Sequence, residues 1–139
     1  MQSENLPLRI ILDSNFLFVP IQFRVDIFRE LEQVTNRKIE VVLLRPVYGE
    51  LKKLSVGGGT KGRHAKMALR YANKIKILDL EANPGETVDD VILRLASEWK
   101  CPVATNDRVL RKKLRDIDVA VIYLRQKSHL EIEGNTTVV

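Results

Sequence analysis

The chain has 139 residues, of which 45% are hydrophobic and 29% are charged, and its formal net charge is +5 at pH 7. This length suits one domain with its own hydrophobic core, so we expect a single domain over residues 1–139, with residues 134–139 as a frayed tail. No apolar run is long enough to span a bilayer, the N-terminus lacks the layout of a signal peptide, and the lone Cys101 cannot form an internal disulfide. These features argue against membrane and disulfide-stabilised secreted proteins, and we expect a cytoplasmic one.

The spacing of apolar residues predicts strands that alternate with helices. In chain order we expect a strand at residues 8–12, a helix at 21–34, a strand at 39–44, helices at 46–55 and 60–73, a strand at 75–80, a helix at 86–99, a short strand at 102–105, a helix at 108–115, a strand at 119–124 and a weak edge strand at 130–132. This alternation predicts an α/β fold, with a central, mainly parallel sheet flanked by helices on both faces.

Turn and capping residues mark several of the expected boundaries. Asp13-Ser14-Asn15 follows the first strand, and Pro46 is suited to the first turn of a helix. Gly57-Gly58-Gly59 predicts a break in the chain, after which Thr60 is expected to cap the next helix.

Two acidic residues directly follow expected strands. Asp13 comes after Ile10-Ile11-Leu12, and Asp107 comes shortly after Val103-Ala104-Thr105. Ligands of open parallel sheets bind outside the carboxyl ends of the strands, where both residues are expected. Taken singly, each is explained better by a capping role at a helix N-terminus.

Two further acids lie on expected helices, at the border of the buried face. Glu50 falls roughly 70° from the centre of the apolar face formed around Val47 and Leu51. Asp89 falls about 90° from the centre of the next helix's apolar face, whereas Asp90 falls about 190° away, towards solvent. A carboxylate at such a border needs a partner, either an arginine or a cation.

Four carboxylates that meet at one point repel each other unless a cation lies between them. Hard divalent cations such as Mg²⁺ and Mn²⁺ prefer oxygen ligands and keep waters that can act as nucleophiles. Isolated histidines, the lone cysteine and the absence of HExxH and GxSxG motifs argue against a zinc site and a serine hydrolase.

Basic residues gather in two runs that contain no acid. The first extends from Lys61 to Lys76 and the second from Arg108 to Arg115. Such runs are often solvated helix faces, but the lack of interleaved acids favours contacts with a polyanion such as RNA. The residues expected to bind RNA are Lys61, Arg63, Lys66, Arg70, Arg111, Lys112 and Arg115.

Four segments together resemble the signature segments of PIN-domain nucleases, in the same order. They are IILDSNFL, the acid in PVYGELKKL, TVDDVILRLA and VATNDRVLRKKL. The resemblance implies a Rossmann-like sheet and an endoribonuclease dependent on Mg²⁺ or Mn²⁺. It implies that the catalytic, metal-binding acids are Asp13, Glu50, Asp89 and Asp107.

The same segments imply supporting roles and partners. Asn15 and Thr105 match positions that would orient the carboxylates or metal-bound waters. Some members of the family carry a further acid where this chain has Val109, a departure that bears on a second metal. The stretches GGGTKGRHAKMALRYA and CPVATNDRVLRKKL resemble the branch that processes pre-ribosomal RNA more than the toxins of toxin–antitoxin pairs. A homodimer and a pre-ribosomal particle or an antitoxin protein are the partners that the resemblance implies.

Two alternative functions stay open from the sequence. One is the toxin component of a toxin–antitoxin pair. The other is a non-catalytic RNA-binding module, which the basic runs support equally well but which gives Glu50 and Asp89 no role.

Overall fold

A computed structural model of the chain describes residues 6–135. Within this range a six-stranded sheet has the order β3-β2-β1-β4-β5-β6, and every neighbouring pair is parallel except β5 and β6. The mainly parallel α/β fold that the sequence predicts is thereby confirmed. The strands are β1 (Leu8–Leu12), β2 (Ile39–Leu44), β3 (Lys76–Leu78), β4 (Val103–Ala104), β5 (Val121–Arg125) and β6 (His129–Glu133).

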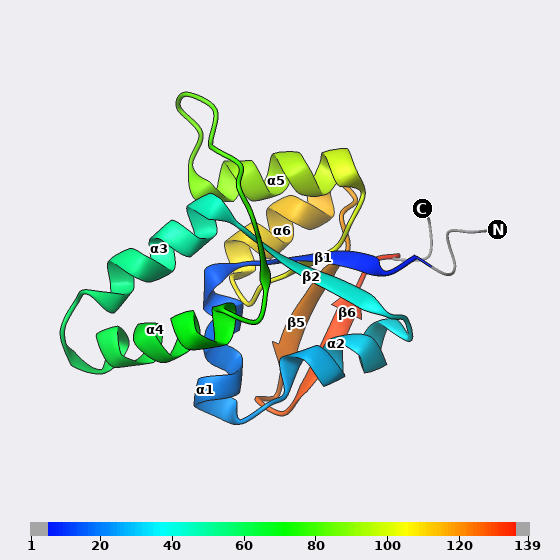
Figure 1. Cartoon of the computed structure of the whole chain (residues 1–139). Helices are drawn as coiled ribbons and strands as arrows, with labels where there is room; N and C mark the ends of the chain where they lie inside the picture. The colour runs from blue at the N-terminus through cyan, green and yellow to red at the C-terminus, as the bar shows by residue number, and fades with distance from the viewer. Residues whose placement is uncertain (1–5, 136–139) are drawn as a thin grey trace.

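Helices cover both faces of the sheet and extend beyond one of its edges. Figure 1 shows α5 and α6 on one face and α2 on the other, whereas α3 and α4 lie side by side beyond the carboxyl ends of the parallel strands. The helices are η2 (Ser14–Phe18, a 3₁₀ helix), α1 (Val19–Phe23), α2 (Ile27–Thr35), α3 (Arg45–Ser55), α4 (Gly59–Ala72), α5 (Val88–Trp99) and α6 (Arg108–Asp116). None of the helices in the described range is long and apolar enough to cross a membrane.

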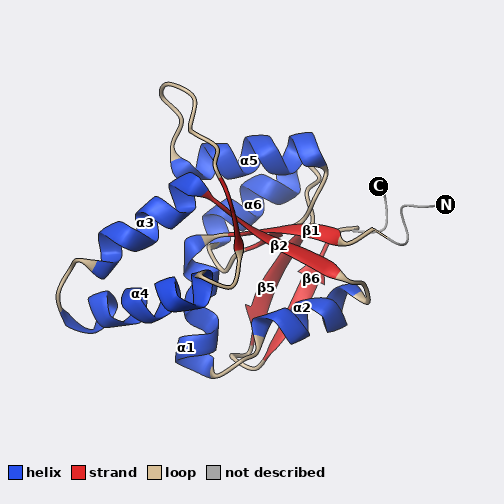
Figure 2. Ribbon diagram, in the orientation of Figure 1, coloured by secondary structure: helices blue, strands red, loops and turns tan. Residues whose placement is uncertain are grey.

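Strand β1 lies in the middle of the sheet and forms the centre of the hydrophobic core (Figure 2). Ile10, Ile11 and Leu12 are completely buried, as expected for a parallel strand that is covered by helices on both faces. Strands β2 and β3 extend the sheet on one side of β1, and β4, β5 and β6 extend it on the other. After β3 the chain therefore returns to the other side of β1, where it adds β4. The point where the strand order reverses lies between the neighbouring strands β1 and β4.

The prediction of one helix over residues 21–34 is wrong. The structure has two helices, because Arg24 adopts a left-handed conformation (φ 55°) that ends α1. The side chain of Asp26 then accepts a hydrogen bond from the backbone N–H of Arg29 and starts α2. Both helices bury apolar residues, so the apolar pattern continues across the break.

The prediction that Thr60 caps the next helix is also wrong. Helix α4 begins at Gly59 and its N-cap is Gly58, without any side-chain cap. A close contact between α3 and α4 explains part of the glycine pattern, since a Cβ atom on Gly62 would clash with the carbonyl group of Gly57. Small buried residues, among them Ala65 and Ala68, follow on the same helix.

Other boundaries differ from the sequence-based ones by a few residues. Helix α5 begins at Val88 instead of residue 86, because Thr87 and Asp90 form a reciprocal capping box. Strands β3 and β4 are shorter than expected, and β6 is a true antiparallel edge strand. Of the expected frayed tail, residues 136–139 lie outside the described residues.

Candidate functional site

The carboxyl ends of β1 and β4 form the point where strand order reverses, and this is where parallel α/β sheets bind ligands. Asp13 directly follows β1, and its backbone N–H donates to the carbonyl oxygen of Ala104 at the end of β4. Thr105 directly follows β4. The pairing of two adjacent parallel strands thus brings residues 13 and 105 together.

Asp13 is buried and held by two hydrogen bonds. Its Oδ2 accepts from the Thr105 hydroxyl at 2.7 Å, and its Oδ1 accepts from the backbone N–H of Ser14 at 2.8 Å. Burial raises the pKa of Asp13 from 3.8 to about 6, which outweighs the lowering effect of the two hydrogen bonds. The charges of Asp89 and Glu50 contribute to the same rise.

Glu50 on α3 and Asp89 on α5 are half-buried and lie near Asp13. The Ser14 hydroxyl donates to Glu50 Oε1 at 3.2 Å, so Ser14 contacts both Asp13 and Glu50. Burial raises the pKa of Glu50, and the charge of Asp89 raises it as well. Burial is also the largest cause of the raised pKa of Asp89, followed by repulsion from Asp107. Repulsion thus couples the four predicted acids.

Asp107 performs a structural task at the same time. Its Oδ1 accepts hydrogen bonds from the backbone N–H groups of Val109 and Leu110, which caps α6. Its own N–H donates to the hydroxyl of Thr105, which in turn donates to Asp13. Thr105 therefore links the two strand-end acids, while Oδ2 of Asp107 takes no part in the cap.

Asp90, the neighbour of Asp89, is exposed and points its carboxylate to its own helix terminus. Its Oδ2 accepts from the N–H of Thr87 at 3.0 Å. The two adjacent acids therefore have different environments: Asp89 faces the other carboxylates, and Asp90 caps α5.

The donor set fits a hard divalent cation in its chemistry. Among residues 6–135, none of the four acids has a lysine, arginine or histidine nitrogen within 4.0 Å, although Lys113 is near enough to lower the pKa of Asp89. Clustered oxygen ligands without a cationic partner match the preference of Mg²⁺ and Mn²⁺. Within residues 6–135, however, no three Asp, Glu, His or Cys side chains are already arranged to hold a metal ion.

Asn15 forms a hydrogen bond with the neighbouring loop, and no side-chain hydrogen bond joins it to the four acids within residues 6–135. Its Oδ1 accepts from the backbone N–H of Asn106 at 3.2 Å, and Asn106 Oδ1 accepts from the N–H of Leu124 on β5. These bonds tie the chain segments that follow β1 and β4 to each other and to strand β5. Sequence reasoning missed Ser14 and Asn106, although both lie beside a predicted acid.

The predicted RNA-binding residues lie on two separate helices. Arg63, Lys66 and Arg70 are exposed on α4, opposite its buried alanines, and Lys61 is exposed near the start of that helix. On α6 the residues are partly engaged in the fold: Arg111 pairs with Glu133, Lys112 pairs with Asp116, and Arg115 donates to the carbonyl of Val119.

Comparison with protein families identifies the family of the chain. Residues 10–127 match the model of the PIN-like domain. The chain belongs to the PIN-domain family. Proteins of this family are generally nucleases and generally use divalent metals.

Relatives of the chain come from two branches of the PIN-domain family. Ribonuclease VapC4 of Methanocaldococcus jannaschii is 34% identical over 130 residues, which are 91% of this chain and 97% of that protein. The rRNA-processing protein FCF1 of Saccharomyces cerevisiae is 31% identical over 80% of this chain, and the match spans only 56% of FCF1. Among solved structures, the PIN-domain endonuclease Utp24 superposes with a TM-score of 0.78 at 27% identity and covers 96% of both chains.

Proposed function

We propose that this protein is an endoribonuclease that hydrolyses RNA phosphodiester bonds with Mg²⁺ or Mn²⁺ held by Asp13, Glu50, Asp89 and Asp107. The observation that carries the proposal is the gathering of these acids at the switch point of the sheet, with no cationic side chain within 4.0 Å among residues 6–135. Membership of the PIN-domain family supports the same function. When bound, the cation supplies charge that offsets the phosphate and lowers the pKa of the attacking water.

The protein's own residues would divide the work according to their environments. Asp13 is the fixed member, because Thr105 and Ser14 hold both of its oxygens. Glu50 is oriented through the Ser14 hydroxyl. Asp89 accepts no hydrogen bond from the described residues and is only half-buried, so a water molecule can reach its carboxylate. Thr105 is proposed to orient Asp13 through its hydroxyl, and Asn15 is proposed to orient waters bound to the metal.

Metal binding can be tested without any knowledge of the natural substrate. A ligand that binds only the native state stabilises it by RT ln(1 + [L]/Kd). We expect Mg²⁺ or Mn²⁺ to raise the melting temperature of the wild type but not that of the D13N/D89N variant. The matched control is D90N, which should keep the wild-type response. An equal metal response in the wild type and D13N/D89N would refute the shared site.

The substrate we propose is ribosomal RNA precursor. The likeness to Utp24 over 96% of both chains and the identity with FCF1 support this branch. The test is cleavage of pre-ribosomal transcripts in Mn²⁺ by the wild type and by D89N, with cuts mapped by primer extension. Specific cuts that D89N does not make would support the assignment, and cleavage of all RNAs at equal rates would contradict it.

A toxin function is the second candidate, because the match to VapC4 covers almost all of that ribonuclease. In this case an antitoxin protein would be the partner. Expression of the wild type should then arrest growth of the host, whereas expression of D13N should not. Normal growth with active, soluble protein would count against a toxin.

A third possibility, a non-catalytic RNA-binding module, would bind RNA through α4 and α6 and cleave none. Wild-type protein that binds RNA but cuts neither single-stranded nor structured RNA in Mg²⁺ or Mn²⁺ would establish it. The cytoplasmic location expected from the sequence stays a prediction.

A further inference from the structure

Three arginines from two elements line a cleft next to Asp107, one of the four acids. The cleft has a volume of ≈ 440 Å³ and lies between the start of α6 and the end of β5. Arg108 and Arg111 come from α6, Arg125 comes from β5, and Tyr123 lies between them. No carboxylate is among the residues that line the cleft. We call this site the arginine cleft.

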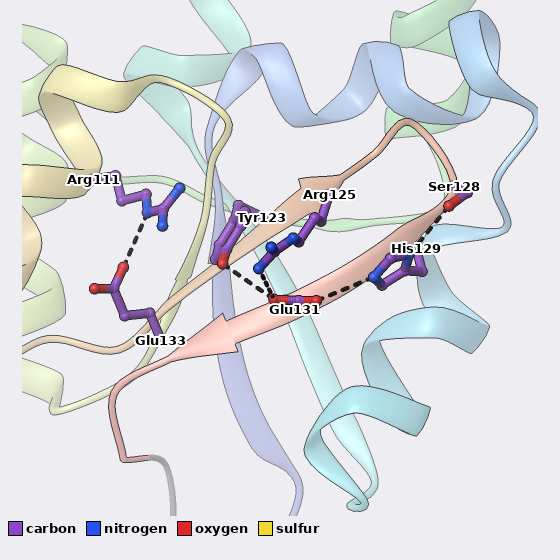
Figure 3. Close-up of polar contacts among 7 residues, drawn as sticks. All are labelled: Arg111, Tyr123, Arg125, Ser128, His129, Glu131 and Glu133. Carbon is purple, nitrogen blue, oxygen red and sulfur yellow. Dashed lines mark hydrogen bonds and ion pairs between the residues drawn. The ribbon is translucent and has the colours of Figure 1, made fainter.

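The cationic and aromatic side chains of the arginine cleft are held in place from outside it. Figure 3 shows that Glu131 on β6 accepts hydrogen bonds from Arg125 at 3.1 Å and from the Tyr123 hydroxyl at 3.3 Å. Glu133, on the same strand, accepts from Arg111 at 3.0 Å, and the Arg111 guanidinium lies 3.7 Å from the centre of the Tyr123 ring. Edge strand β6 thus fixes two arginines, which reduces the entropy that a ligand would lose on ordering them.

Arg108 differs from the other two arginines in having no ion pair within residues 6–135. It is exposed and is the first residue of α6, directly after Asp107. A cation at this position lies at the positive end of the helix dipole, where it lowers helix stability. The position of Arg108 is therefore not explained by the stability of α6, whereas an anionic ligand would offset its charge.

The arginine cleft adjoins the carboxylates along the same edge of the sheet. Asn106 lines the cleft and immediately precedes Asp107, and its side chain holds the backbone of Leu124 beside Arg125. Asn106 is also bonded to Asn15, which follows Asp13 and Ser14. An RNA strand bound at the acids could therefore extend along the protein surface into the arginine cleft.

We propose that the arginine cleft binds a backbone phosphate of the RNA strand, close to the phosphate that is cut. This inference rests on the proposed function for the identity of the strand. Arginine is suited to the task because its planar group donates two parallel hydrogen bonds to phosphate oxygens. Arg108 and Arg125 are the donors, and β6 keeps Arg125 and Arg111 in register with the carboxylates.

The test measures binding of a fluorescently labelled, single-stranded RNA oligonucleotide in EDTA, so that cleavage does not interfere. The variant is R108Q/R125Q. The control is K38Q/K100Q, which removes the same charge. Lys38 and Lys100 are exposed and precede β2 and β4, so they lie at the amino ends of the strands, opposite the acids. We expect R108Q/R125Q to weaken binding by roughly tenfold or more, since hydrogen bonds to charged groups are the stronger class. The dependence of its affinity on salt should become shallower by about 0.7 for each phosphate that the variant no longer neutralises.

An equal weakening of RNA binding in R108Q/R125Q and K38Q/K100Q would overturn the arginine cleft, as would a wild type that does not bind RNA. If R108Q/R125Q fails to fold, R108Q alone carries the test, because Arg108 is exposed and has no ion pair in the described range. Arginine-dependent binding without cleavage by the wild type would support the cleft and contradict the nuclease. Cleavage with an unchanged KM in R108Q/R125Q would do the reverse.

Discussion

The two ends of the parallel strands are built from different kinds of residue. We call them the carboxyl edge and the amino edge of the sheet. At the carboxyl edge, Asp13 and Asp107 follow β1 and β4, and each accepts hydrogen bonds from the start of the next helix. At the amino edge, α2 and α5 end in left-handed residues, Asn36 (φ 55°) and Lys100 (φ 53°), which lead the chain into the next strand. A strand-to-helix turn favours an acid that can cap the helix, whereas a helix-to-strand turn favours a residue that can adopt the left-handed conformation.

This difference explains part of the acidic cluster but not all of it. Capping accounts for Asp13 and Asp107, whereas Glu50 and Asp89 lie within helices and cap nothing. Burial raises the pKa of both Glu50 and Asp89, and repulsion from neighbouring acids raises both as well, so these acids carry an electrostatic cost. We therefore expect changes at the amino edge to alter stability alone, and changes at the carboxyl edge to alter chemistry as well.

The largest effect is expected from the neighbours Asp89 and Asp90. D89N should lower single-turnover RNA cleavage by more than about 100-fold, which is the upper range for groups that only support metal ligands. D90N should retain most of the cleavage, because an asparagine oxygen can still accept the bond from Thr87. Loss of cleavage in D90N but not in D89N would mean that the four clustered acids do not carry out the cleavage.

The second prediction concerns the pH dependence of stability without metal. Because burial raises the pKa of Asp13 from 3.8 to about 6, protonation of Asp13 favours the native state. Its contribution is fully present below pH 3.8 and is lost as the pH rises through about 6, a change of about 3 kcal/mol. Urea unfolding in EDTA at pH 4 and pH 7 should therefore show a larger loss of stability for the wild type than for D13N. Parallel pH profiles of the two proteins would contradict the raised pKa.

The third prediction tests the link between the two strand-end acids. T105V removes the hydroxyl that donates to Asp13 and accepts from the N–H of Asp107. We expect the free energy of unfolding to fall by about 2 kcal/mol, since the Asp13 carboxylate and the N–H of Asp107 both lose a hydrogen-bond partner. The pKa of Asp13 should also rise, because the Thr105 bond lowers it. T105S keeps the hydroxyl, so its pH profile should match the wild type; identical behaviour of both variants would dismiss the hydroxyl's role.

The smallest effect is expected at the amino edge. N36A places alanine at a left-handed residue, which should cost about 1 kcal/mol of stability. Cleavage per folded molecule should not change, because Asn36 lies at the opposite edge from the acids. A specific loss of cleavage in N36A, at a temperature where the variant is fully folded, would show that the two edges are not independent.

Much of the fold could be predicted from the sequence because the pattern is strong in a parallel sheet. Buried strands such as Ile39–Leu44 are apolar runs with a single interruption, here Glu40, and helices such as α3 repeat apolar residues every three or four positions. The break at Arg24 escaped prediction because it depends on one backbone conformation that a non-glycine residue rarely adopts. The start of α4 escaped for a related reason, since glycines and not Thr60 provide its first turn.

The candidate site could be predicted only in outline. Periodicity separates Asp89 from Asp90, and the structure gives these two acids different environments. Hydrogen bonds between distant segments, such as Ser14 to Glu50 and Asn106 to Leu124, depend on how strands are paired and leave no local pattern. The arginine cleft escaped for the same reason, because Arg108 and Arg125 come together only through the pairing of β4 with β5.

The short strand β4 has a consequence for how the protein is made. It consists of two residues, lies between β1 and β5, and is the only element that brings Thr105 and Asp107 to Asp13 in the described part of the chain. A nascent chain that has emerged only as far as α5 therefore contains three of the acids and lacks the fourth. The complete group of acids can therefore form only after β4 has been synthesised and has inserted beside β1.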